Sequence, residues 1–391
     1  MNYFFMITSR KTMATPGEIA IPQSADDIAP SWVQQVLQRD LPDVIITDVD
    51  VKGPVGQGEG FMTNIIAFDA VGTRNGASQR YSLVAKLTDF ATMICPKDKQ
   101  IEFERVEVEF YSNTVPELLA MSNEDRSLAD PFFLPKCYFA ATDPSSMVSV
   151  RVMENLKTQG FSIKPDRQPL SREEMMLTAG ALAQLHGLSH RLELRSGVPL
   201  PEKCVLGTFA PEVVGHLCQG GLKTFAEAFP EEKDLLARLE KVVDAKSFVE
   251  DMSNSKSQRV RVLNHGDCWT NNIMIKYEAD VPTAVKLVDW QVLQYLPPTY
   301  DLAMLFLCSA AWDVFHNHRD AVLAHYHQQL QNALGPKEPL SLQSYTLEQL
   351  KADFRTDCLY GVFSRVMRMI VLRPDTDFLR MVQEIKGWGL L

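Results

Sequence analysis

Residues whose types suit catalysis gather in one part of the chain, between positions 264 and 289. Residues 264–272 read Asn-His-Gly-Asp-Cys-Trp-Thr-Asn-Asn and separate two strand-like stretches, 260–263 and 273–277. A third apolar run ends at Val288 and is followed directly by Asp289. Short polar segments between buried strands are typical of loops that face a ligand, so this segment is the first candidate for a site.

Three side chains of this segment supply what phosphoryl transfer requires: Asp267, Asn272 and Asp289. That reaction needs one carboxylate near the attacking hydroxyl. It also needs an amide oxygen and a second carboxylate to share the divalent cations that bridge nucleotide phosphates. Any one of these residues alone could simply cap a turn. The three together on one predicted β-hairpin favour the chemical interpretation over the structural one.

Two upstream features suit the binding of phosphates. Gly56, Gly58 and Gly60 alternate between two predicted strands, where bare backbone could approach phosphates closely, although a flexible hairpin turn has the same pattern. Lys86 ends the apolar strand Ser-Leu-Val-Ala-Lys, which would direct its ammonium group toward the inside of the sheet. A solvated edge lysine is the alternative, but both flanks are apolar, and the strand resembles the phosphate-pairing lysine strand of kinases.

The carboxylate that would pair with Lys86 is expected on the next helix, where Glu104, Glu107 and Glu109 are the candidates. Glu107 stands three and four residues before two aromatic residues, so it shares a helix face with side chains that would pack inward. Glu109 then faces solvent. We therefore favour Glu107 as the partner.

The elements that must position these residues change character along the chain. The first third is rich in strands and the remainder is mostly helical, which predicts a two-lobe α+β fold with its boundary near Asn155. We expect a loose tail over 1–28, a nucleotide-binding sheet lobe over 29–155 and a helical lobe with the catalytic loop and acceptor pocket over 156–391. Strands are expected at 44–51, 61–71, 81–87, 136–141 and 147–153, with a helix at 99–119.

Composition excludes several classes of protein. The chain has 391 residues, of which 46% are hydrophobic and 23% charged, as is usual for globular proteins. Its 39 basic residues against 49 acidic ones give a net charge of −10, so we expect no nucleic-acid partner. The longest apolar run, 302–312, is shorter than the roughly 18 residues of a membrane span, so we expect no membrane partner either.

The cysteines and the N-terminus indicate the compartment. Seven scattered cysteines without a Cys-x-x-Cys pair favour a reducing environment, and we expect a cytoplasmic protein without an obligate protein partner. The apolar patch at 3–7 precedes its basic residues, which is the reverse of a secretory signal. Met13 is an alternative start to Met1.

Taken together, these motifs resemble the group of aminoglycoside phosphotransferases and choline kinases and, within it, the ecdysteroid kinase-like family. The resemblance covers about residues 30–390. It rests on His265-Gly266-Asp267 with Asn272, on Asp289-Trp290-Gln291, on Pro298-Thr299-Tyr300-Asp301-Leu302, on Glu107-x-x-Phe110-Tyr111, on Met153-Glu154-Asn155-Leu156, and on Leu182-Ala183-Gln184-Leu185-His186.

The resemblance implies a protein-kinase-like fold with ATP and Mg²⁺ as cofactors. It implies that Asp267 accepts the proton of the substrate hydroxyl or orients that hydroxyl, and that Asn272 and Asp289 hold Mg²⁺. His265, the other candidate in the catalytic set, would brace the loop rather than perform chemistry. Asp301 would fix the loop from below.

The implied nucleotide site uses the other lobe. Lys86 would bind the nucleotide phosphates, with Glu107 positioning it, and the loop of Gly56, Gly58 and Gly60 would cover them. Backbone groups of Met153, Glu154 and Asn155 would bond the edge of the adenine.

Spacing indicates which kind of kinase this would be. Only residues 290–300 separate Asp289 from Asp301, too few for the activation segment of a protein kinase. Gly266 stands where protein kinases carry the arginine that contacts a phosphorylated activation loop. A helical insert at about 211–252 could wall a pocket for a compact acceptor, so a small-molecule alcohol is the expected substrate.

Three functions therefore compete. The first is an ATP- and Mg²⁺-dependent O-phosphotransferase acting on a steroid-like alcohol, such as an ecdysteroid, or on a xenobiotic alcohol. The second is a kinase of choline or aminoglycosides, which keeps the chemistry and changes the acceptor. The third is a non-catalytic pseudokinase that binds a nucleotide or a lipophile, and the presence of Lys86, Asp267, Asn272 and Asp289 disfavours it.

Overall fold

The structure is a computed structural model that describes residues 19–55, 63–88, 97–124, 133–207, 211–244, 259–335 and 344–391. The chain divides into two units. The first unit comprises Met1–Ile101 and Lys136–Asn155, and the second comprises Glu102–Pro135 and Leu156–Leu391.

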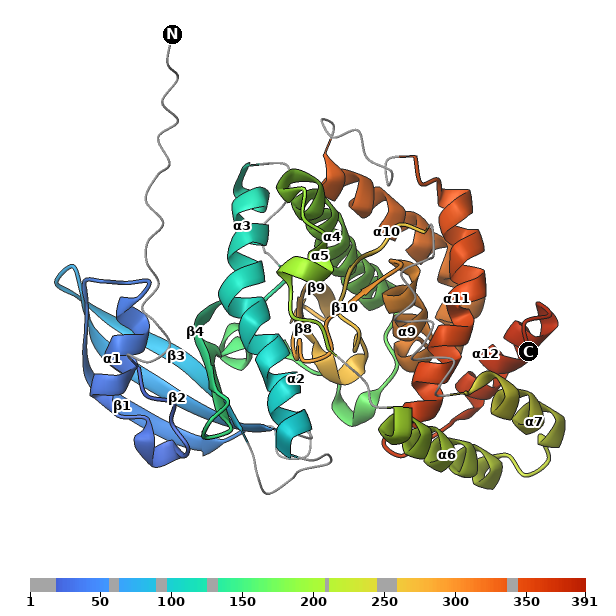
Figure 1. Cartoon of the computed structure of the whole chain (residues 1–391), viewed down its shortest axis with the longest axis horizontal. Helices are drawn as coiled ribbons and strands as arrows, with labels where there is room; N and C mark the ends of the chain where they lie inside the picture. The colour runs from blue at the N-terminus through green and yellow to red at the C-terminus, as the bar shows by residue number, and fades with distance from the viewer. Residues whose placement is uncertain are drawn as a thin grey trace, which may run out of the picture. The chain divides into compact units, whose positions relative to one another are not determined.

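The first unit is built on a five-stranded antiparallel sheet with the strand order β1-β2-β3-β5-β4 (Figure 1). Asn75 and Gly76, at φ 50° and 76°, form the tight turn between the second and third strands, the geometry that an Asn-Gly pair favours in hairpins. The strands are β1 (Val44–Pro54), β2 (Thr63–Arg74), β3 (Ala77–Thr88), β4 (Cys137–Asp143) and β5 (Val148–Glu154).

Helix α1 (Pro30–Gln38) packs against β1 and closes one side of this unit's core. Pro30 at the first helical position fits the helix start, because its missing N–H would have no partner there. Trp32, Val33 and Val36 recur at helical spacing and are buried in one cluster with residues of the sheet. Their burial explains why this short helix is stable beside the strands.

The second unit is mostly helical. Helices α9 and α11 lie side by side (Figure 1), and they approach so closely that a Cβ on Gly361 would lie 2.4 Å from the Ala303 carbonyl oxygen. The helices are α3 (Val115–Glu124), α4 (Arg172–Ser196), α5 (Leu200–Lys203), α6 (Pro211–Ala228), α7 (Lys233–Val242), α9 (Thr299–Ser309), α10 (Arg319–Leu334), α11 (Leu347–Arg368) and α12 (Thr376–Gly387).

Two small sheets within the helical unit carry the polar segment singled out above. One pairs β7 (Val262–Asn264) with β10 (Gln294–Leu296), and the other has the order β6-β8-β9. Its members are β6 (Phe161–Ser162), β8 (Ile273–Glu278) and β9 (Val281–Leu287). β8 and β9 form a hairpin with Ile273 opposite Leu287, so the start of one strand lies beside the end of the other.

The predicted α+β fold with an antiparallel sheet lobe and a helical lobe is confirmed. Individual elements differ. The single helix expected at 99–119 is α2 (Lys97–Glu109), a π-helical turn (Phe110–Thr114) and α3, and the chain passes from the first unit to the second within α2. β6 and β10 are too short for a sequence pattern to show.

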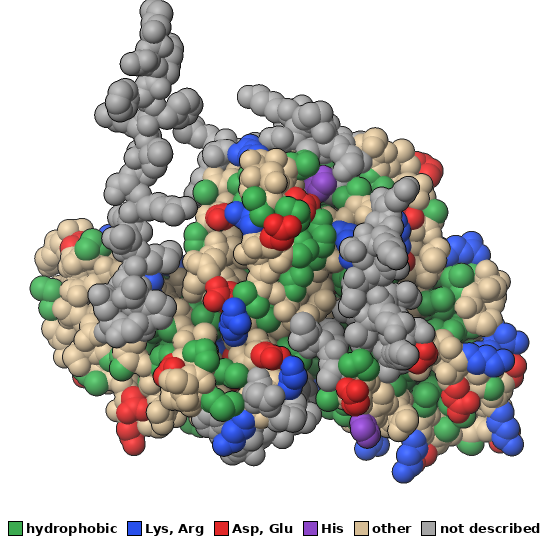
Figure 2. Space-filling model, viewed as in Figure 1, with side chains coloured by type: hydrophobic (Ala, Val, Ile, Leu, Met, Phe, Trp, Pro, Cys, Tyr) green, Lys and Arg blue, Asp and Glu red, His purple; other side chains and the backbone are tan. Residues whose placement is uncertain are grey.

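Surface charge is mixed on the face drawn in Figure 2, where basic and acidic side chains are interspersed. At the end of the helical unit, Lys386 and Arg238 both pair with Asp234, at 2.7 and 2.9 Å. Among the residues that the structure describes, no helix is both long and apolar enough to cross a membrane.

Candidate active site

The polar loop begins with a turn that only glycine can make. Gly266 has φ +76°, and a Cβ at this position would lie 2.0 Å from the Val292 carbonyl oxygen. The left-handed backbone disfavours any residue other than glycine, and the close approach of the Val292 carbonyl oxygen leaves no room for a side chain. The arginine that protein kinases carry here therefore has no room in this chain.

A buried carboxylate holds this turn from below. Asp301, in the first turn of α9, accepts hydrogen bonds from the backbone N–H of His265 at 2.6 Å and of Gly266 at 2.9 Å. Its own N–H donates to the side-chain oxygen of Asn264, at 3.2 Å. Asp301 is 1% exposed, so its charge is satisfied by these donors rather than by water.

A histidine and a tyrosine continue this support. His186, from α4, has Nε2 3.2 Å from the Asp301 carboxylate and Nδ1 2.7 Å from the Tyr326 hydroxyl. Burial, with the nearby Tyr345 and Asp301, raises the pKa of Tyr326 well above its ordinary value, so the hydroxyl keeps its proton. Because the Asp301 carboxylate only accepts, Nε2–H of His186 donates to it, and in the neutral ring Nδ1 accepts from the Tyr326 hydroxyl.

The upper side of the loop is built differently. The Asn272 side-chain nitrogen donates to both the backbone oxygen and the Oδ2 of Asp267, each at 2.8 Å. Arg368, at the end of α11, donates from Nη2 to the Oδ1 of Asp267 and forms an ion pair with it. The Asp267 side chain keeps 19% exposure, so it faces solvent in part.

His265 is fully buried and uses both ring nitrogens inside the loop. Its Nε2 donates to the Val288 carbonyl oxygen at 3.0 Å, and its Nδ1 accepts the N–H of Asp267 at 3.2 Å. The ring also lies against Trp290, with centroids 4.3 Å apart. This geometry favours a bracing role over a chemical one.

The β8–β9 hairpin brings Asn272 and Asp289 to the same end. The N–H of Val288, which precedes Asp289, donates to the Asn272 carbonyl oxygen at 3.0 Å. Asp289 has φ +68°, a conformation that non-glycine residues adopt rarely and that often marks functional positions. The hairpin thus joins the loop of Asp267 to the segment that carries Asp289.

Glu107 is linked to that same segment. Its Oε1 accepts the backbone N–H of Trp290 at 3.3 Å, and Phe110 stacks on the Trp290 ring at 4.5 Å. Glu104 and Glu107 are both buried, so burial alone does not distinguish them. The contact with Trp290 ties Glu107 to the residue next to Asp289.

The remaining predicted residues belong to the first unit. Lys86 is 5% exposed on β3 and stands opposite Arg151 of β5 in the ladder. The N–H of Glu154 donates to Lys136 and that of Asn155 to Ser82, at 2.9 and 3.0 Å. Met153 pairs with Val84 and Cys137 in the sheet, and Gly56, Gly58 and Gly60 lie outside the described residues.

The donor set of the loop fits Mg²⁺. Because the Asn272 nitrogen donates to Asp267, the amide oxygen of Asn272 is left as the oxygen ligand, and Asp289 supplies a carboxylate two residues after Leu287, which pairs with Ile273 in the hairpin. Within the described ranges, no three His, Cys, Asp or Glu side chains lie close enough to hold a metal by themselves. Mg²⁺ commonly takes one or two protein oxygens, and substrate phosphates and water complete its coordination.

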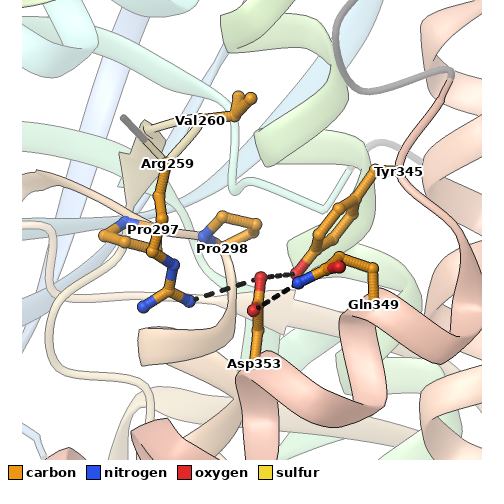
Figure 3. A pocket seen from close by; sticks show the side chains of 7 residues that line it. All are labelled: Arg259, Val260, Pro297, Pro298, Tyr345, Gln349 and Asp353. Carbon is orange, nitrogen blue, oxygen red and sulfur yellow. Dashed lines mark hydrogen bonds and ion pairs between the residues drawn. The ribbon is translucent and has the colours of Figure 1, made fainter. Parts of the chain in front are cut away.

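A separate pocket of about 190 Å³ lies elsewhere in the second unit (Figure 3). Asp353 accepts hydrogen bonds there from the Tyr345 hydroxyl at 2.7 Å and from Gln349 at 2.8 Å, and Arg259 lies 3.6 Å away. The polar groups of the pocket therefore face one another, as Figure 3 shows. The predicted site residues do not line it.

Sequence reasoning gave no role to three residues of this site. His186 stands within a motif of the family resemblance, but nothing in its spacing indicates contact with Asp301. Tyr326 carries no signal in the sequence, and neither does Arg368, because a basic residue near a helix C-terminus is common. Arg368 lies 101 residues from Asp267 along the chain.

The comparison with protein families identifies the family of the chain. The profile of the ecdysteroid kinase-like family matches residues 57–336, which is more than half of the chain. The chain belongs to the ecdysteroid kinase-like family. Among curated proteins, none matches the sequence significantly.

Two of the solved structures that match are an ethanolamine kinase and an aminoglycoside phosphotransferase. A Plasmodium vivax ethanolamine kinase is 15% identical, with 92% of this chain and 88% of that chain covered and a TM-score of 0.39. The GDP complex of wild-type aminoglycoside 2′-phosphotransferase-IIIa is 13% identical, with 92% and 99% covered and a TM-score of 0.40. At these identities and scores, the likeness says nothing about what this chain binds.

Proposed function

We propose that this chain transfers the γ-phosphoryl group of ATP to a hydroxyl of a small molecule. The observation that carries the proposal is the hairpin geometry, in which Asn272 contacts Asp267 and its carbonyl oxygen accepts the N–H of Val288, the residue before Asp289. Membership of the ecdysteroid kinase-like family supports the same class of chemistry. An intact set of these side chains also argues against a non-catalytic pseudokinase.

The reaction moves one phosphoryl group and one proton. A bond forms between the acceptor oxygen and the γ-phosphorus, while the bond from that phosphorus to the β,γ-bridging oxygen breaks and its electrons leave with ADP. The Asp267 carboxylate accepts the proton of the acceptor hydroxyl or orients that hydroxyl for attack. Asn272 and Asp289 would hold Mg²⁺, which neutralises phosphate charge when bound.

The sheet unit would bind the nucleotide. In this proposal, Lys86 binds its phosphates and Glu107 positions Lys86, while the loop of Gly56, Gly58 and Gly60 covers the phosphates. Backbone groups of residues 153–155 bond the adenine edge. We further propose that residues 29–155 and 156–391 act as the two lobes, and that the protein works in the cytoplasm.

The proposed acceptor is a steroid-like or xenobiotic alcohol. The family supports this class. A binding pocket for choline or an aminoglycoside would need acidic side chains that hold cationic groups, whereas a steroid needs an apolar wall. The acceptor panel of the experiment below distinguishes these classes directly.

The test is incubation of the full chain with ATP, Mg²⁺ and a panel of ecdysteroids, other polar steroids, xenobiotic alcohols, aminoglycosides and choline. Mass spectrometry of the products should show one added phosphate on a steroid or xenobiotic alcohol. Asp267→Asn should keep nucleotide affinity and lose about 10²- to 10⁴-fold in turnover, because the orienting carboxylate is gone. Normal turnover by this variant would refute the role of Asp267.

A further inference from the structure

Arg368 meets the proposed catalytic carboxylate directly. Its Nη2 donates to the Oδ1 of Asp267, and its Nη1 donates to the backbone oxygen of Ser364 at 2.9 Å. The two side chains of the ion pair are only 14% and 19% exposed. Arg368 lies beyond the span 57–336 that the family profile matches.

With this ion pair, each of the two carboxylate oxygens of Asp267 accepts a hydrogen bond from a side chain. Arg368 holds Oδ1, and Asn272 holds Oδ2 at 2.8 Å. Burial lowers the pKa of the Arg368 guanidinium, but the Asp267 carboxylate more than offsets this, so that the pKa lies above its ordinary value. The guanidinium is therefore charged, and its planar set of donors fixes the direction of the group that it binds.

Helix α11 is itself held firmly, so Arg368 is presented from a rigid support. Arg259 binds Asp357 of this helix through two hydrogen bonds, at 2.9 and 2.6 Å. Gly361 lets the helix approach Ala303 of α9, the helix whose Asp301 holds the loop from below. Helix α11 and the polar loop are therefore both held by contacts with α9.

We propose that Arg368 is a positioning residue for phosphoryl transfer, which fixes the plane of the Asp267 carboxylate so that it meets the acceptor hydroxyl. The inference rests on the proposed function. A purely structural arginine would stabilise the fold without affecting turnover per folded molecule. An inhibitory arginine that blocks Asp267 would slow the enzyme, so removing Arg368 would then raise turnover.

The experiment compares Arg368→Ala and Arg368→Lys with the wild-type chain. Each protein receives ATP, Mg²⁺ and the acceptor found in the panel. A second assay omits the acceptor and follows ATP hydrolysis by phosphate release, with water as the acceptor. Arg368→Ala should lower kcat about 10- to 100-fold, because a misdirected carboxylate loses the attack geometry. The KM for ATP should change less than twofold. Arg368→Lys should recover part of the loss, since it restores charge but not the planar donors.

Guanidinium ion added in solution supplies a second readout. It should raise kcat of Arg368→Ala and leave the wild type unchanged at the same concentration. The matched control is Arg365→Ala, one turn away on the same helix, where the side chain donates to the Cys308 and Arg373 carbonyl oxygens and not to Asp267. This control should lower the melting temperature without any recovery by guanidinium.

The variant Asp267→Asn tests whether Arg368 acts through Asp267. If Arg368 acts through Asp267, adding Arg368→Ala to Asp267→Asn should cost no further turnover. Wild-type or faster turnover by Arg368→Ala, with an active wild-type enzyme, would overturn the positioning role alone. A wild-type chain that neither binds ATP nor transfers phosphate would overturn the proposed function and this inference with it.

Discussion

Two carboxylates at the polar loop, residues 264–272, are held by different kinds of partner. Below the loop, Asp301 receives backbone N–H groups of His265 and Gly266 and is 1% exposed. Above it, the Asp267 carboxylate accepts from the side chains of Asn272 and Arg368 and retains 19% exposure. One carboxylate is part of the interior, and the other stands at its edge.

This difference suggests different roles for the two carboxylates: Asp301 stabilises the fold, and Asp267 is available for a substrate. A buried carboxylate that accepts backbone donors fixes the path of the chain, and its removal leaves those donors unpaired. A partly exposed carboxylate held by side chains can accept a new hydrogen bond from a substrate while the loop stays in place. We therefore expect changes below the loop to unfold the protein and changes above it to slow the reaction.

The largest effect is expected from Gly266→Ala. The added Cβ would lie 2.0 Å from the Val292 oxygen in a backbone that already has φ +76°, so the loop must move. We expect a loss of about 3 kcal/mol or more in unfolding free energy and the loss of nearly all turnover. Thermal unfolding and phosphate release measure the two.

A second glycine provides the control for that change. Gly197, which ends α4, also has positive φ, +64°, but no atom lies within 4 Å of a Cβ placed there. Gly197→Ala should therefore cost only about 1 kcal/mol and leave turnover intact. If the two alanine variants behaved alike, the close approach to Val292 would have no importance.

The direct test of the comparison sets Asp301→Asn beside Asp267→Asn. The amide at 301 would turn an NH₂ group toward one of the backbone donors, so we expect a loss of about 3 kcal/mol in unfolding free energy. Asp267→Asn should unfold within about 1 kcal/mol of the wild type, yet turn over far more slowly. Equal losses of stability in both variants would remove the distinction between the two sides.

The sequence predicts the parts of the site that depend on local spacing. Asp267, Asn272 and Asp289 flank the two strands of one hairpin, and alternating strand and turn patterns predict hairpins well. The two-lobe α+β fold is predicted for the same reason, since the change from strand to helix texture is visible along the chain. The chemical roles of the residues stay predictions.

Contacts between distant segments are not predicted. Arg368 reaches Asp267 from α11, which packs on α9, and His186 reaches Asp301 from α4, which packs on β7 and β9. The π-helical turn after Glu109 likewise interrupts a helix whose sequence reads as continuous. Such features depend on tertiary packing, which residue spacing along one chain does not encode.

The smallest predicted effect lies at the far end of α4, the helix that carries His186. Glu174 caps its first turn and accepts hydrogen bonds from Lys164 at 2.8 Å and from the Ser171 N–H at 2.7 Å, as well as from the Tyr277 hydroxyl. Burial raises the pKa of Glu174, but these donors outweigh it, so that the pKa lies below its ordinary value.

The sign of the pH dependence follows from that depressed pKa. The stabilisation by ionised Glu174 is complete above the unfolded-state pKa of about 4.3 and is lost as pH falls through the lower folded-state pKa. Glu174→Gln should therefore cost about 1 kcal/mol at pH 7 and progressively less toward pH 3, as melting curves would show. The matched control is Glu173→Gln at the exposed neighbouring position, which should change the melting temperature little at pH 7. Position 174 is 12 residues, or about 18 Å of helix, from His186, so Glu174→Gln should leave kcat unchanged. A lower kcat would mean that the contacts that support the loop depend on the whole length of α4.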